Sequence, residues 1–167
     1  MSCTALAPAT ALVALFALAP TASAMPMGGT FSAQVDGQAA QPMGAAGQVR
    51  ISRTASGTNA GPGTPLDGAT VRIKDMAVLK NGQGAMKGTI VFVTANGSTS
   101  SPYTGTLSTD ATGRVTAEGA FHAVRGKGEF NGLKGRGQFS VAYSSPTEFS
   151  GTWQGDFQLP PQRTSRR

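Results

Sequence analysis

Two side chains close together in the sequence have the chemistry for proton transfer. His122 is the only histidine, and Glu118 lies four residues before it. In an unbroken β-strand both would share one face, which we expect to be inward, and burial would shift their pKa values toward acid–base work. The odd-numbered apolar residues of 113–121 instead place Glu118 outside. A β-bulge near residues 122–125 would reconcile the two registers, so both facings stay open.

Asp75 is the third candidate for acid–base chemistry. It has the same parity in 69–80 as four apolar residues, namely Val71, Ile73, Ala77 and Leu79. This parity predicts an inward carboxylate, and a buried carboxylate requires a partner. An edge strand or a bulge at Asp75 is the alternative. If the protein is an enzyme, we expect it to use Asp75, Glu118 or His122.

The sequence lacks the common catalytic motifs. It has no G-x-S-x-G stretch, no serine paired with a nearby histidine, and no G-x-x-x-x-G-K-[ST] phosphate loop. One histidine without a partner cysteine does not make a zinc site. We therefore assign no catalytic residue, metal site or cofactor, and whether the protein is an enzyme stays open.

The first 24 residues differ from the rest of the chain. They carry no charged side chain, their apolar run is too short to span a bilayer, and they end in the small-x-small pattern Ala22-Ser23-Ala24. We predict a secretory signal peptide over residues 1–24, cut before Met25, although no basic residue precedes Arg50. A disordered alanine-rich leader is the alternative. The mature protein is then secreted or periplasmic, has no membrane span, and lacks cysteine because Cys3 is the only one.

The chain is basic but sparsely charged. Its formal net charge is +6 and its pI is about 10.1, while charged residues make up 13%. Such a surface suits solubility alone or contact with an anionic surface. Nucleic-acid binders usually carry dense Lys/Arg stripes with aromatic residues between them, whereas the densest run here is the tail, 163–167. We therefore expect no nucleic acid as a partner, and the oligomeric state is not predicted.

Short strands separated by turn residues must position these side chains. No stretch has a convincing helical period, so we predict an all-β antiparallel domain over residues 25–160 and a disordered basic tail over 161–167. Eight or nine strands suit an up-and-down barrel of about eight strands, or a sandwich. Residues 55–68 read as a loop, since they hold four glycines and two prolines. The expected strands are 29–36, 47–54, 69–80, 84–95, 101–109, 113–124, 126–130, 133–143 and 147–159.

The stretch GKGEFNGLKGRGQF, residues 126–139, has five glycines in fourteen positions. Asn131-Gly132 predicts a two-residue type I′ turn, which pairs Phe130 with Leu133 in a hairpin. This register places the strand glycines inside the barrel, where they leave room for bulky groups such as Trp153. The inner face also holds Val124, Phe139, Val141 and Tyr143, and the outer face holds Arg125, Lys127, Lys134 and Arg136.

This glycine-rich stretch, followed by a strand and then by FSGTWQGDF, resembles the C-terminal half of the allene oxide cyclase-like barrel group. That group includes dirigent-like and related bacterial domains. The likeness covers about residues 124–158 and implies an antiparallel eight-stranded barrel of the calycin-like or allene oxide cyclase-like kind. We find no match to the acidic and arginine residues that those enzymes use, so no catalytic residue is carried over.

Three functions remain in competition. The first is non-enzymatic binding of a small apolar ligand inside the barrel, against Trp153, Phe139, Tyr143 and His122. The second is an enzyme of the cyclase or dirigent-like type. The third is an envelope or matrix protein whose outer stripe binds an anionic surface through Arg125, Lys127, Lys134 and Arg136.

Overall fold

The computed structural model describes residues 24–158 except residues 45 and 123. Almost all of the predicted signal peptide, and the whole predicted tail, lie outside these residues. The described residues form nine β-strands and no helix, and hence no helix that could cross a membrane. The strands are β1 (Met25–Pro42), β2 (Gln48–Ala60), β3 (Thr70–Lys80), β4 (Gln83–Thr94), β5 (Gly97–Thr109), β6 (Val115–Phe121), β7 (Arg125–Gly128), β8 (Lys134–Tyr143) and β9 (Glu148–Gln158).

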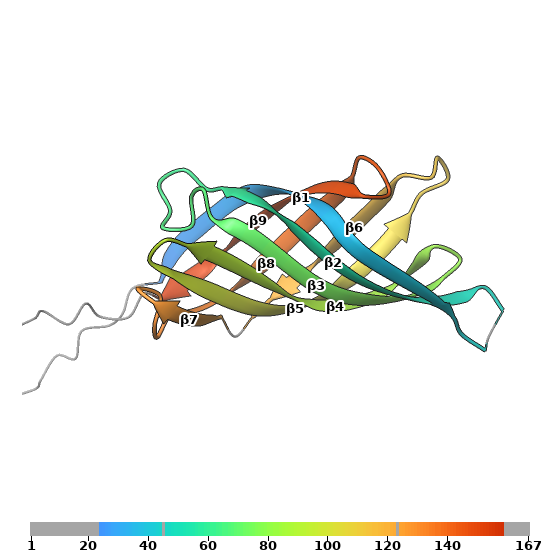
Figure 1. Cartoon of the computed structure of the whole chain (residues 1–167), viewed down its shortest axis with the longest axis horizontal. Helices are drawn as coiled ribbons and strands as arrows, with labels where there is room; N and C mark the ends of the chain where they lie inside the picture. The colour runs from blue at the N-terminus through green and yellow to red at the C-terminus, as the bar shows by residue number, and fades with distance from the viewer. Residues whose placement is uncertain (1–23, 45, 123, 159–167) are drawn as a thin grey trace, which may run out of the picture.

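Eight of these strands close into an antiparallel barrel (Figure 1). The order around the barrel is β4-β3-β2-β1-β9-β8-β6-β5, and the pairing of β4 with β5 closes it. The remaining strand, β7, is short, lies outside this closed order and pairs only with β5. The predicted all-β antiparallel barrel of about eight strands is therefore confirmed, with one extra strand.

Strict alternation sorts the side chains between the lumen and the surface. In β9, Phe149, Trp153 and Phe157 are buried while the residues between them are largely exposed. The inward glycines receive aromatic rings, because a Cβ at Gly137 would lie 2.4 Å from the Phe121 ring and one at Gly151 would lie 2.7 Å from the Phe31 ring. These glycines therefore let large rings fill the lumen.

The predicted hairpin at Asn131-Gly132 is wrong. β7 pairs with β5, whereas β8 pairs with β6 and β9. β6 ends at Phe121 and β7 continues along the same edge of β5, so the chain leaves β5 before it turns into β8. Asn131 lacks the positive φ of a type I′ turn, which Asn81 and Gly82 do have, with φ of 53° and 79°, between β3 and β4.

The predicted facing of this region survives the change of partner. Phe130 and Leu133 are buried, and the charged residues around them are exposed. Burial of apolar side chains sets which face points inward, whichever strand supplies the hydrogen bonds.

Three strands are longer than predicted, namely β1, β2 and β5, and the last begins at Gly97 where the expected strand was 101–109. β1 runs well beyond 29–36, and β2 continues to Ala60, so the first six residues of the predicted loop 55–68 are strand. Gly57 in this stretch lies opposite Ala33, where an added Cβ would come within 1.9 Å of the Ser32 carbonyl oxygen. The glycine marks a close approach of two strands and not a turn.

The two ends of the barrel differ. The end on the left of Figure 1 carries β7, and Leu66, Phe130 and Leu133 are buried there. The opposite end carries the connections 43–47, 81–82, 110–114 and 144–147. A cavity opens at this second end of the barrel. We call this cavity the mouth.

Candidate functional site

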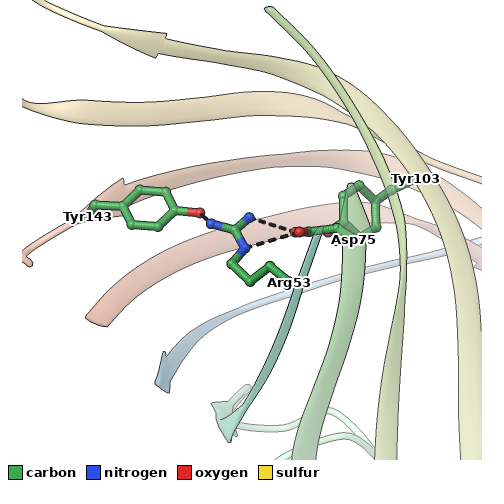
Figure 2. A network of polar contacts seen from close by, with 4 residues as sticks. All are labelled: Arg53, Asp75, Tyr103 and Tyr143. Atoms are coloured by element: carbon green, nitrogen blue, oxygen red, sulfur yellow. Dashed lines mark hydrogen bonds and ion pairs between the residues drawn. The ribbon is translucent and has the colours of Figure 1, made fainter. Parts of the chain in front are cut away.

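A polar chain of four side chains crosses the lumen below the mouth (Figure 2). Tyr143 on β8, Arg53 on β2, Asp75 on β3 and Tyr103 on β5 make it up. Burying a charged group inside a barrel costs free energy unless the group is paired, so the charges of Arg53 and Asp75 must be compensated within this network.

The strand registers explain why these residues meet. Arg53 and Asp75 are directly opposite in the β2–β3 ladder, and alternation turns both inward. Asp75 and Tyr103 flank Gly88 of the intervening β4. A Cβ on Gly88 would lie 2.6 Å from the Asp75 Cβ and 2.8 Å from the Tyr103 Cζ, so only glycine lets the tyrosine reach across β4.

The contacts of Arg53 are those of a bidentate ion pair. Its Nε donates to Asp75 Oδ1 at 3.0 Å and its Nη2 donates to Asp75 Oδ2 at 2.6 Å. The Tyr103 hydroxyl donates to Asp75 Oδ2 at 2.7 Å, and Arg53 Nη1 donates to the Tyr143 hydroxyl. The Arg53 Cζ also lies 5.2 Å from the Tyr143 ring centroid, within range of a cation–π contact.

These surroundings shift the pKa values of Arg53, Tyr103 and Tyr143. Burial would lower the pKa of Arg53, but the hydrogen bonds and charge of Asp75 outweigh it and raise that pKa. Burial and then the Asp75 charge raise the pKa of Tyr103 far above its ordinary value. Burial also raises the pKa of Tyr143, although the Arg53 charge opposes this. Arg53 is thus a fixed cation and both tyrosines are neutral donors at neutral pH.

The network separates two cavities. The mouth is a cavity of about 570 Å³ that ends on Arg53, Asp75 and Tyr143. A smaller cavity of about 50 Å³ lies deeper in the lumen, beside Trp153. It has room for about two water molecules but not for benzene, which fills a cavity of about 150 Å³. The mouth is therefore the part of the lumen that could admit a small molecule.

The mouth has apolar walls and a donor-rich floor. Its walls include Ile51, Ala77, Leu79, Leu107 and Val115. On the floor, the contacts above use three of the five N–H donors of Arg53, and the O–H of Tyr143 has no acceptor among the described residues. Asp75 already accepts three hydrogen bonds of the four or so that a carboxylate can accept, so most of the unused hydrogen-bonding capacity at the floor belongs to donors.

The structure places the other predicted ligand-binding residues apart from the mouth. Trp153 is buried beside the deep cavity and donates from Nε1 to Asn59 Oδ1 at 2.8 Å, and Phe139 also lines that cavity. Of the four predicted residues, Tyr143 alone contacts the mouth, since His122 is also absent from its lining.

Of the three acid–base candidates, only Asp75 points into the lumen. His122 is exposed, so its predicted inward facing is wrong. The predicted irregularity exists, because the strand breaks between Phe121 and Arg125, and Phe121 and Val124 both turn inward around the break. Glu118 is exposed on the outer face, as the odd-numbered apolar residues indicated.

The predicted basic stripe is split between two strands. Arg125 and Lys127 lie on β7, while Lys134 and Arg136 lie on β8, and these two strands do not pair. All four side chains are exposed, and Arg136 lies opposite Asp156 of β9.

Sequence reasoning missed Arg53 and Tyr103. The signal for Arg53 was present, since it alternates in phase with Val49, Ile51 and Ala55. The predicted loop 55–68 ends the strand at residue 54, however, and so removes Ala55 from the inward pattern that includes Arg53. Tyr103 needed the pairing of β4 with β5, which shows Gly88 between the tyrosine and Asp75.

In the described part of the chain, no three His, Cys, Asp or Glu side chains gather where they could hold a metal ion. No family model matches the sequence, and no curated protein matches it. The resemblance to the allene oxide cyclase-like group therefore remains a prediction.

Proposed function

We propose that the protein binds a small, mainly apolar molecule in the mouth of the barrel, with a hydrogen-bond acceptor of that molecule seated on Arg53 and Tyr143. The observation that carries this is the mouth itself, about 570 Å³ in volume, with aliphatic walls above a floor of free donors. Ligand sites generally have this size and combine apolar walls with few polar groups.

The floor favours binding over proton transfer. Arg53 and the two tyrosines are held away from titration near neutral pH, and Asp75 is engaged by Arg53 and Tyr103. A general acid or base works best with a pKa near the operating pH. A carboxylate, sulfonate or carbonyl head group would instead find donors already in place, which reduces the cost of ordering the site.

The predicted signal peptide would place this binding in the periplasm or the medium. The proposal is independent of that location, because the mouth is built from β1, β2, β3, β5, β6 and β8 and from the connections 110–114 and 144–147.

Two experiments test the mouth. Native mass spectrometry of the gently purified protein shows whether a small molecule is retained. A titration with anilinonaphthalene sulfonate, an apolar dye with an anionic head, then measures binding through its fluorescence. Ile51→Trp fills the mouth from a half-buried wall position, and Ser150→Trp adds the same ring at an exposed position on the outer face of β9, which does not line the mouth.

We expect dye affinity to fall at least about tenfold in Ile51→Trp and to stay unchanged in Ser150→Trp. Both variants should keep the circular dichroism spectrum of the parent. Equal dye binding by the parent and Ile51→Trp, with the fold intact, would rule the mouth out as the site.

A further inference from the structure

The outer face of β2, β3 and β4 carries an excess of positive charge that the lumen does not explain. These neighbouring strands (Figure 1) turn five exposed cations outward and no carboxylate; Asp75, the one acidic residue in them, points inward. We call this surface the basic face. Its cations are Arg50, Arg72, Lys74, Lys80 and Lys87.

The rest of the described surface has the opposite balance. Outside the basic face and the buried Arg53–Asp75 pair, the described residues carry five cations and seven carboxylates. The cations are Arg114, Arg125, Lys127, Lys134 and Arg136, and the carboxylates are Asp36, Asp67, Asp110, Glu118, Glu129, Glu148 and Asp156. The net positive charge of the barrel is therefore concentrated on one side and is not spread for solubility.

The cations lie close enough to act together. Lys74 pairs with Thr89, and Met76 with Lys87, so the two lysines are diagonal neighbours on adjacent strands. Such neighbours are about 7–8 Å apart at Cβ, within a Debye length at physiological salt. One carboxylate, Asp36 of β1, touches the margin of the face by accepting a hydrogen bond from Ser56 at 2.8 Å. The centre of the face keeps its charge unneutralised.

Like-charged neighbours oppose folding slightly, so this arrangement needs a compensating use. We propose that the basic face binds the anionic headgroups of a lipid bilayer. The basic face is three strands wide, about 10 Å, and eleven residues long on β3, about 35 Å, so a flat bilayer can contact several of its cations at once.

The side chains between the cations favour lipid over a soluble polyanion. Met76, Val78, Val91 and Val93 lie half-buried on the same outer face. Aliphatic groups gain from contact with the bilayer interface, whereas a hydrated polysaccharide offers them little apolar surface. Each Lys or Arg near an anionic membrane contributes enough that removing three weakens binding on the order of 100-fold.

The test compares two triple variants with the same change of net charge. Arg72→Gln, Lys74→Gln and Lys87→Gln neutralise the basic face, while Lys127→Gln, Lys134→Gln and Arg136→Gln neutralise the other side. Co-sedimentation measures the affinity of the purified protein for phosphatidylcholine–phosphatidylglycerol vesicles, with pure phosphatidylcholine vesicles as the reference. Thermal unfolding checks that both variants fold.

We expect the parent to bind the anionic vesicles and not the pure phosphatidylcholine vesicles. Its affinity for the anionic vesicles should fall steeply as salt is added. The basic-face variant should bind on the order of 100-fold more weakly, and the other variant should stay close to the parent. Equal weakening in both variants would reduce the effect to net charge and overturn the proposal. Binding to soluble polyuronate without binding to vesicles would also overturn it.

Discussion

At the scale of the residue, Arg53 is the costliest side chain in the barrel. Its side chain is 7% exposed and that of Asp75 is 3% exposed, so each charge depends on the other for compensation. Removing one partner of such a pair costs roughly 3–5 kcal/mol, whereas replacing both by apolar groups is often neutral. The contribution of the pair to stability therefore depends on the coupling between the two charges, and measuring that coupling requires a double variant beside the single ones.

We predict that Asp75→Asn lowers the free energy of unfolding by about 3–5 kcal/mol, because it leaves the Arg53 cation buried without its counter-charge. The double variant Arg53→Met with Asp75→Leu should recover most of that loss. Urea unfolding measures both. Arg114→Gln is the control, since the Arg114–Asp110 pair is exposed, and it should change stability by less than about 1 kcal/mol. If the stability losses of the single variants Arg53→Met and Asp75→Leu simply add in the double variant, the pair is not coupled as described.

At the scale of the element, β4 is the strand that makes the network possible. Gly88 removes the side chain that would otherwise separate Asp75 from Tyr103. A Cβ there would also come within 2.6 Å of the Lys74 carbonyl oxygen, which is backbone and cannot move aside cheaply.

We predict that Gly88→Val costs about 1–3 kcal/mol in the free energy of unfolding through overpacking, and that it breaks the Tyr103–Asp75 hydrogen bond. Urea unfolding measures the first effect and near-ultraviolet circular dichroism of the tyrosines reports the second. Ala85→Val, at an exposed outward position of the same strand, adds similar bulk at little cost. Comparable losses in both variants would mean that β4 merely resists β-branched residues.

Much of this element-level description follows from sequence periodicity. The facing of β9, of Asp75 and of Phe130 was predictable because burial imposes a period of two on any strand in a closed barrel. The strand with which β7 pairs was not predictable. The Asn131-Gly132 motif indicates only a local preference of the backbone, whereas the actual partner, β5, lies about 30 residues earlier in the sequence. The network was partly predictable for the same reason: parity gives the inward facing of Arg53 and Asp75, and only cross-strand register brings Tyr103 to Asp75 across Gly88.

At the scale of the whole molecule, the barrel separates its two candidate surfaces. The mouth lies at one end, and the basic face runs along one side. A protein lying on a bilayer along the basic face would keep its long axis parallel to the membrane and leave the mouth open at its end. The two proposals are therefore compatible, and either one can fail without the other.

Ionisation of the two tyrosines reports whether the whole barrel stays closed, so one pH titration tests the fold. The chain contains two tyrosines, Tyr103 and Tyr143, and both belong to the network. Their pKa values are raised in the folded barrel, so folding favours the neutral hydroxyls. This contribution to stability is fully present below the ordinary tyrosine pKa of about 10 and is lost as the pH rises above it.

We predict that Tyr103 gives no tyrosinate absorbance in native protein as the pH passes 10 and that Tyr143 ionises above its ordinary pKa, while urea-unfolded protein titrates both tyrosines near pH 10. Above that pH the free energy of unfolding should fall by about 1.4 kcal/mol per pH unit for Tyr103, and Tyr143 should add to this fall until its own folded-state pKa is reached. Tyr143→Phe should halve the absorbance change and leave Tyr103 silent in the folded state. Tyrosinate absorbance with a midpoint near pH 10 in protein that keeps its native circular dichroism would contradict a buried network, because the hydroxyls would then be ionising in water while the barrel stays closed.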